Sequence, residues 1–299
     1  MDKKEVEKFQ SMTDMWWNLN GPAKGLNTMN KLRVPFVINS LKSIGFLKTD
    51  ENSDKPLQDV SILDVGCGCG IMTEPLSRLG ADVTGVDGVP EMIKCAEDHA
   101  ALDKDLKEIK YFAEPIQTFS ERNKEKFDVV VASELLEHVT DKAGVVKSSV
   151  ECLKPGGSIF ITTESKTLLS KWITIYWIEN IVKAVPKGAH EIDMYITPED
   201  TQKLLEQNDC TVKTVKGTFY NAYSGTWHYS PFIIDMDPKE DSTQNKQAAD
   251  STTKDLTSDN ADKSAYDSGT SEKLEKLNIE IEKNKFFRDC SILAKTIPK

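Results

Sequence analysis

The sequence predicts an α/β fold in which helices cover both faces of a mostly parallel sheet. Between residues 57 and 162, short apolar runs alternate with helical stretches, which is the order typical of βαβ units. Four of the six residues at 60–65 are apolar, and we expect a strand there that is buried on both faces. A glycine-rich segment at 66–70 follows it directly and can form the tight turn that joins a strand to a helix. These three observations define the centre of the expected fold.

The individual elements follow from the same alternation. Apolar residues at helical spacing predict helices, and short apolar runs predict strands. We expect strands at 60–65, 82–86, 109–112, 127–132, 158–162 and 290–294. We expect helices at 2–19, 29–45, 71–79, 90–100, 143–153 and 168–185, and one from 198 to about 206. The last helix follows Thr197, a typical N-cap, and has a proline and two acids in its first turn.

The chain divides into four expected segments. Residues 1–48 form a helical cover, and residues 57–235 hold the α/β domain. The stretch 236–285 is rich in charged and small polar residues, and Tyr266 is its only aromatic residue. Such a composition buries too little apolar surface to offset the entropy of ordering, so we expect most of it to be disordered. Residues 286–299 then supply the final strand of the sheet, which makes the acidic tract an insertion.

The helix expected at 168–185 is unusually apolar and contains two tryptophans. It is too short, and too polar on one side, to span a bilayer. It can pack in the core, as many apolar helices do. It can also lie in a membrane surface, where Lys171 and Lys183 would suit anionic lipids. The sequence leaves both interpretations open.

Composition argues against several classes of protein. The 299 residues carry a formal net charge of −10, which disfavours sequence-independent binding to nucleic acid. No apolar run approaches the ~20 residues that a membrane-spanning helix needs. The six cysteines form no C-x-x-C pair, so we expect a reducing compartment and neither a disulfide framework nor a structural zinc site. Residues 1–7 are rich in acids and do not have the layout of a targeting segment.

The strongest local motif is L-D-V-G-C-G-C-G at 63–70. Its glycines allow a ligand to approach the backbone closely, and they open the N-terminus of the following helix toward that ligand. The spacing is G-x-G-x-G and not the G-x-G-x-x-G of dinucleotide binders, and Asp64 suits an ammonium or amide better than a pyrophosphate. Asp87 follows Gly70 by 17 residues and ends the second strand, where a carboxylate accepts hydrogen bonds from ribose hydroxyls.

Four features in order carry a resemblance. The glycine-rich loop, Asp87, the strand F-D-V-V-V at 127–131 and the turn K-P-G-G at 154–157 together resemble class I S-adenosylmethionine (SAM) methyltransferases. The resemblance implies a Rossmann-like, seven-stranded, mostly parallel sheet with helices on both faces. The alternative is a glycine turn in an unrelated α/β protein, in which the agreement of all four features would be accidental.

A second cluster, S-E-L-L-E-H-V at 133–139, follows the fourth parallel strand. Ligands of open α/β sheets bind at this edge. Glu134, Glu137 and His138 are spaced i, i+3 and i+4, so they share one face if the segment is helical. Such a set can hold a divalent ion and leave positions open for an oxygen ligand. In the alternative interpretation the histidine only packs or forms hydrogen bonds near the cofactor.

Further motifs narrow the resemblance to one family. They are W-W-N-L-N-G at 16–21, M-N-K-L-R at 29–33, E-L-L-E-H-V at 134–139, P-K-G-A-H-E at 186–191 and G-T-F-Y-N at 217–221. In this order they resemble the ubiquinone-biosynthesis O-methyltransferases, which methylate catechol hydroxyls of polyprenylated rings such as 3-demethylubiquinol and polyprenyl-dihydroxybenzoate. The similarity covers about residues 5–235 and the last ten or so, whereas 236–285 has no counterpart in the family pattern.

The family resemblance implies roles for particular residues. It implies SAM contacts from four residues: Arg33, Gly66, Asp87 and Ser133. It implies Mg²⁺ ligands at Glu134, Glu137 and His138. A divalent ion on both catechol oxygens would lower the hydroxyl pKa from its usual ~10 and fix the ring. If no metal binds directly, His138 or His190 is the expected general base.

The resemblance also implies a location and partners. We expect a peripheral protein on the matrix side of the mitochondrial inner membrane, in a ubiquinone-biosynthesis complex, with a polyprenylated catechol or quinol as substrate. The helix at 168–185 would contact the membrane, and no nucleic acid would bind. Two other functions stay open: a SAM methyltransferase for a different small molecule, and an inert SAM-binding scaffold that docks through 236–285.

Overall fold

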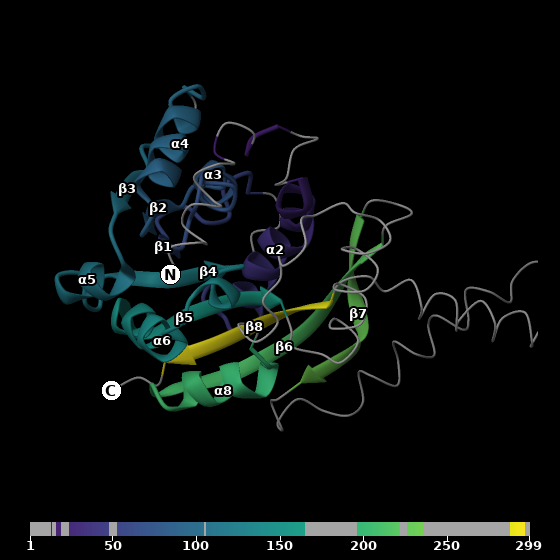
Figure 1. Cartoon of the computed structure of the whole chain (residues 1–299). Helices are drawn as coiled ribbons and strands as arrows, with labels where there is room; N and C mark the ends of the chain where they lie inside the picture. The colour runs from purple at the N-terminus through teal and green to yellow at the C-terminus, as the bar shows by residue number, and fades with distance from the viewer. Residues whose placement is uncertain are drawn as a thin grey trace, which may run out of the picture.

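A mixed sheet is the framework of the described structure (Figure 1). The computed structural model describes residues 13, 16–18, 24–47, 53–104, 106–164, 196–221, 226–235 and 288–296. Within these ranges the sheet has eight strands in the order β3-β2-β1-β4-β5-β8-β6-β7. They are β1 Ser61–Val65, β2 Asp82–Asp87, β3 Lys110–Ala113, β4 Phe127–Ser133, β5 Leu153–Glu164, β6 Cys210–Asn221, β7 Thr226–Asp235 and β8 Arg288–Thr296. The first five in spatial order are parallel, and β8, β6 and β7 pair antiparallel.

Clusters of buried apolar residues hold the helices against both faces of the sheet. The helices are α2 Lys24–Ser43, α3 Thr73–Arg78, α4 Pro90–Ala100, α5 Ile116–Glu121, α6 Lys142–Glu151 and α8 Pro198–Glu206, with a 3₁₀ turn η2 at Leu136–His138. Alternate residues of β4 serve the two faces: Val130 packs with α5, α6 and α8, while Val129 and Val131 pack with α2 and α3. This is the period of two expected for a strand covered on both sides.

The order of the strands determines where a ligand can bind. The chain enters the sheet at β1, runs outward to β2 and β3, and then returns to place β4 on the other side of β1. The connections that leave β1 and β4 therefore run in opposite directions along the sheet. In open α/β sheets, ligands bind at the carboxyl ends of the strands beside such a reversal. Gly66, Asp87 and Ser133 all lie at this edge, at or directly after the ends of β1, β2 and β4.

Most predicted elements are confirmed, with shifted bounds, and the final strand is the most informative of them. Predicted at 290–294, it is β8, and it lies between β5 and β6 (yellow in Figure 1). The sheet has eight strands in the described ranges rather than seven, because β7 adds an edge strand beside β6. The helix predicted at 2–19 is wrong at its end, since residues 16 and 17 form a turn.

Several predicted features lie outside the described residues. They are the helix at 168–185, His190, the tract 236–285 and most of residues 1–23. In the part of the chain that is described, no helix is both long and apolar enough to cross a bilayer.

Candidate cofactor and substrate site

The glycine-rich turn after β1 depends on its glycines. Gly66, Gly68 and Gly70 have φ angles of 69°, 54° and 88°, in the left-handed region that other residues rarely adopt. A Cβ atom on Gly66 would lie 2.6 Å from Cδ1 of Leu135, so a side chain there would require Leu135 to move. The Gly66 N–H donates to the carbonyl of Val86 at 2.8 Å, which ties the turn to the end of β2.

Asp87 closes the turn from the neighbouring strand. Its side chain is buried, and its Oδ2 and Oδ1 accept from the N–H groups of Gly68 (3.0 Å) and Val89 (2.8 Å). Burial raises the pKa of Asp87, while these two N–H donors and the nearby charge of His138 lower it. A carboxylate oxygen can accept more than one hydrogen bond, so Asp87 can still bind a pair of hydroxyls at the sheet edge.

Asp64 lies inside the strand that precedes the turn and has a different role from Asp87. It is fully buried, and its Oδ2 accepts from the Thr73 hydroxyl at 2.6 Å. Burial raises the pKa of Asp64 to about 7, and Thr73 and Arg33 oppose that rise. The contact with Thr73 links the end of β1 to the first turn of α3, so Asp64 stabilises the geometry of the glycine-rich turn.

Arg33 projects from α2 toward the same edge. Its guanidinium is buried and donates to the Asn30 side chain and to the Leu26 carbonyl. Its Nη1 lies 3.9 Å from Oε1 of Glu134, the residue after β4. The structure therefore brings the predicted cofactor residue Arg33 to the carboxyl end of β4, where it faces a carboxylate.

The three predicted metal ligands do not form one site. Among the described residues, no group of three His, Cys, Asp or Glu side chains is placed to hold an ion. The expected helical face does not form, because Glu134 has a φ of 50° and η2 begins only at Leu136. Glu134 then faces Arg33, while the buried Glu137 accepts from the Thr163 hydroxyl at 2.7 Å. The structure corrects the prediction of a shared face.

Contacts from the N-terminal part of the chain were missed by sequence reasoning. The Trp17 indole N–H donates to the Cys69 carbonyl at 2.9 Å, and the Trp17 ring stacks on His99 at 3.5 Å with an interplanar angle of 2°. His99 Nδ1 in turn lies 2.6 Å from Oε1 of the buried Glu74. These partners are far apart in the sequence, so no local pattern marks the contact. The W-W motif is the only signal that points to this segment.

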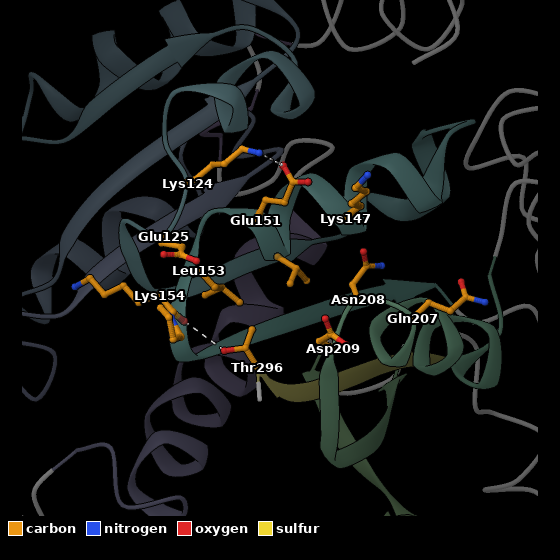
Figure 2. Close-up of a pocket in the computed structure, with 12 residues that line it drawn as sticks. Lys124, Glu125, Lys147, Glu151, Leu153, Lys154, Gln207, Asn208, Asp209 and Thr296 are labelled. Atoms are coloured by element: carbon orange, nitrogen blue, oxygen red, sulfur yellow. Dashed lines mark hydrogen bonds and ion pairs between the residues drawn. The ribbon is translucent and has the colours of Figure 1, made fainter. Parts of the chain in front are cut away.

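A pocket lies at the other end of the strands, away from the edge that carries Asp87 (Figure 2). It has a volume of about 380 Å³ and lies at the amino ends of β5 and β6, lined by charges of both signs. Lys124 pairs with Glu151 at 3.5 Å, and the Thr296 hydroxyl donates to the Lys154 carbonyl at 3.3 Å. The residues that line the pocket therefore favour neither an anionic nor a cationic ligand. The pocket is separate from the edge of the sheet that holds Asp87.

Comparison with known proteins decides the family. The family model "Methyltransferase domain" matches residues 63–161. The ubiquinone biosynthesis O-methyltransferase of Pelagibacter ubique is 35% identical over 228 residues, which cover 76% of this chain and 92% of that protein. The chain belongs to the ubiquinone biosynthesis O-methyltransferase family. The mitochondrial relatives from Rattus norvegicus and Homo sapiens are each 45% identical, and the matches cover 77% of this chain but only 66% and 62% of theirs.

Solved structures show the fold independently of the family assignment. Magnesium protoporphyrin IX methyltransferase from Synechocystis, solved with bound SAH, superposes with a TM-score of 0.53 at 19% identity, covering 72% of this chain and 93% of that one. A methyltransferase from Bacillus halodurans gives a TM-score of 0.50 at 18% identity, with 88% and 99% covered. The predicted Rossmann-like class I methyltransferase fold is therefore confirmed.

Proposed function

We propose that this protein is a SAM-dependent O-methyltransferase that acts on a catechol hydroxyl of a polyprenylated ubiquinone precursor. The observation that carries the proposal is the kinship with the ubiquinone biosynthesis O-methyltransferases, which extends over 92% of the Pelagibacter protein. The candidate substrates are those implied by the family resemblance: 3-demethylubiquinol and polyprenyl-dihydroxybenzoate.

The carboxyl edge of β1, β2 and β4 fits the cofactor. Asp87 would accept from the ribose hydroxyls, and the turn at Gly66 would let the backbone approach the methionine part. Ser133 ends β4 beside this turn, and its hydroxyl oxygen is enclosed without a hydrogen-bond partner in the described structure. Arg33 lies across the same edge. When bound, SAM supplies an electrophilic methyl group on a cationic sulfur.

The chain must then position the acceptor and take its proton. A catechol hydroxyl has a pKa of ~10, like that of tyrosine, so it is mostly protonated and weakly nucleophilic near neutral pH. His138 is half-buried and lies at the end of the η2 turn, which follows β4 at the carboxyl edge of the sheet. We assign His138 as the proton acceptor, and His190 is the second candidate. Much of the rate gain would come from holding the hydroxyl oxygen in line with the methyl group.

None of these steps passes through a metal ion, because the described positions of Glu134, Glu137 and His138 do not fit one. A metal-bound state would need the backbone between Glu134 and the η2 turn to rearrange so that the three side chains converge. The two oxygens of a catechol are the ligands that a substrate would add to such a state.

The location belongs to the same proposal. The eukaryotic relatives are named as mitochondrial proteins. We place this protein on the matrix side of the inner membrane, attached peripherally through residues 168–185 and associated with other enzymes of the pathway. The polyprenyl tail of the substrate gives the physical reason, since it partitions into lipid.

Methyl transfer from labelled SAM to a soluble catechol, 3,4-dihydroxybenzoate, tests the activity directly. We expect an O-methylated product, and we expect His138→Ala to slow its formation by about 100-fold, the size typical of general-base catalysis. SAM binding without any turnover would contradict the proposal and favour the inert scaffold. Parallel reactions with EDTA, and with EDTA plus excess Mg²⁺, show whether turnover needs the ion.

A further inference from the structure

One row of polar side chains crosses the sheet near its carboxyl edge. Ser133 on β4 is in register with Thr162 on β5, Thr162 with Ser291 on β8, and Ser291 with Lys216 on β6. Residues in register on neighbouring strands project to the same face. We call these four residues the polar row. The face is the one that α2 covers, because the positions two residues earlier on β4 and β5 pack with the α2 cluster.

The polar row lies next to a row of apolar side chains. The preceding registered positions on β4, β5 and β8 are Val131, Phe160 and Leu293, which are all buried. Phe36 of α2 meets Phe160 edge-on, with ring centroids 5.8 Å apart. At one end of the row, the Lys216 ammonium lies 5.8 Å from the centroid of the Phe36 ring, so α2 covers that end, and the two hydroxyls at the other end need a separate explanation.

Two hydroxyls of the row have no partner within the described chain. Ser133 Oγ and Thr162 Oγ1 are both enclosed without a hydrogen bond, and Thr162 is only 4% exposed. Buried polar atoms nearly always find a partner, so neighbouring unpartnered hydroxyls at a binding edge indicate a ligand. Both can donate as well as accept, which matches the hydroxyl groups of an aromatic acceptor.

The order of the strands determines how far each hydroxyl of the polar row lies from the expected cofactor. β4 lies next to β1, whose end carries the glycine-rich turn, so Ser133 is nearest to the expected cofactor. Thr162 is one strand farther away, and Lys216 is at the far end, with its ammonium over the Tyr229 ring at 5.3 Å. A ring lying along this row would present one oxygen near the methyl donor and the adjacent oxygen near Thr162.

We propose that the polar row is the acceptor subsite, and that Thr162 binds the ring oxygen adjacent to the one that is methylated. The inference rests on the proposed function and deepens it. Thr162 would then be a specificity-determining residue for aromatic rings with two neighbouring oxygens. A ring with a single oxygen would leave the Thr162 hydroxyl without its partner, so such a ring should gain little from Thr162.

The contribution of the second ring oxygen tests the proposal in the full-length protein. The probe is 3,4-dihydroxybenzoate, and 3-hydroxybenzoate, which lacks the neighbouring oxygen, is the comparison ligand; the measurements are KM and kcat for the probe and the competitive inhibition constant of the comparison ligand. For Thr162→Val, which keeps the shape of the side chain, we expect the KM of the probe to rise about 5- to 10-fold, as for the loss of one hydrogen bond. We expect the inhibition constant of 3-hydroxybenzoate to change by no more than about two-fold, and the SAM Kd from calorimetry to stay unchanged. Thr162→Ser should restore the KM of the probe.

Ser158→Ala is the matched control. Ser158 lies on the same strand four residues earlier, projects to the same face, is 1% exposed and also has an unpartnered hydroxyl, but it lies toward the amino end. We expect this variant to keep the wild-type KM for the probe. If valine prevents folding, Thr162→Ala provides the same comparison against Thr162→Ser.

The outcomes separate the inference from the function on which it rests. If the wild type methylates the probe but Thr162→Val keeps its KM, or raises the inhibition constant of 3-hydroxybenzoate by the same factor, the subsite is wrong and the function stands. A shift of equal size in Ser158→Ala would also overturn the subsite. If the wild type binds SAM and methylates neither oxygen of the probe, the proposed function fails, and the subsite fails with it.

Discussion

The contact between Trp17 and the glycine-rich turn makes the sharpest prediction about how the N-terminal segment acts. The indole N–H donates to the Cys69 carbonyl at 2.9 Å, and Cys69 is fully buried. Trp17→Phe removes this donor but leaves an aromatic ring that can stack on His99. A buried carbonyl that loses its donor costs about 1–3 kcal/mol, so we expect the free energy of unfolding to fall by about 1–2 kcal/mol.

The same substitution should weaken cofactor binding, because the Cys69 carbonyl lies between Gly68 and Gly70 and its position sets the turn. We expect the SAM Kd to rise about 3- to 10-fold, which corresponds to about 0.7–1.4 kcal/mol. Trp17→Leu also removes the stacking, worth about 0.5–1.5 kcal/mol more, and should be worse in both respects.

Urea denaturation and calorimetry with SAM measure the two effects of Trp17→Phe. With an m-value of about 2 kcal/mol/M, the urea midpoint should fall by about 0.5–1 M. Leu102→Ala is the control, since Leu102 is 78% exposed and lies three residues beyond His99. If Trp17→Phe matches the wild type in both midpoint and SAM Kd, the contact does not hold the turn and the reasoning is refuted.

Three further predictions follow from the same site. Burial raises the pKa of Asp64 to about 7, so the folded protein holds a proton that the unfolded chain releases near pH 4. The free energy of unfolding should therefore fall as the pH rises from 4 to 7, by up to about 4 kcal/mol. If plots of unfolding free energy against pH have the same slope for the wild type and Asp64→Asn, the prediction is contradicted. Gly66→Ala, forced to a φ of 69° against Leu135, should lower the unfolding free energy by at least about 1–2 kcal/mol, whereas Gly88→Ala, with open space around it, should not; equal effects would contradict the steric account. When Mg²⁺ is titrated into the substrate-free protein, the wild type and Glu137→Gln should give the same binding heat, because the described side chains form no metal site. A saturable heat that is lost in Glu137→Gln but kept in the control Glu121→Gln would contradict this and show that the ligand set is already assembled.

The sequence predicts the part of the site that depends on local pattern. The turn at 66–70 and Asp87 could be placed because the strand, the glycines and the acid each leave a signal within a few residues. Glycines are needed in the turn because its φ angles are left-handed, and Asp87 is needed because its carboxylate accepts hydrogen bonds from two N–H groups. Such features need no knowledge of distant segments.

The helical face expected for Glu134, Glu137 and His138 does not form, and this has a definite cause. Their spacing puts them on one face only if the backbone is α-helical from the first residue. Glu134 instead adopts a φ of 50°, and its N–H donates to the Thr162 carbonyl at 2.8 Å, which continues the β4–β5 pairing. The sheet pairing therefore overrides the local helical pattern, and a spacing rule cannot anticipate it.

Long-range contacts account for the rest of what the sequence could not predict. His99 has no motif around it, and its place beside the glycine-rich turn depends on Trp17, 82 residues earlier. The polar row joins four strands whose register is fixed only when β8 enters between β5 and β6. Thr162 alone looks like an ordinary strand residue, and its significance comes from Ser133 beside it.

Calorimetry with SAM on the full chain and on Asp87→Asn tests the central claim, that the carboxyl edge of β1 and β2 binds the methyl donor. We predict saturable one-to-one binding by the wild type and about 100-fold weaker binding by the variant, as expected for two charge-assisted hydrogen bonds to ribose. Asp82→Asn, at the exposed start of the same strand, should bind like the wild type. An absence of binding heat in the folded wild type, or equal affinity in the wild type and Asp87→Asn, would contradict the claim.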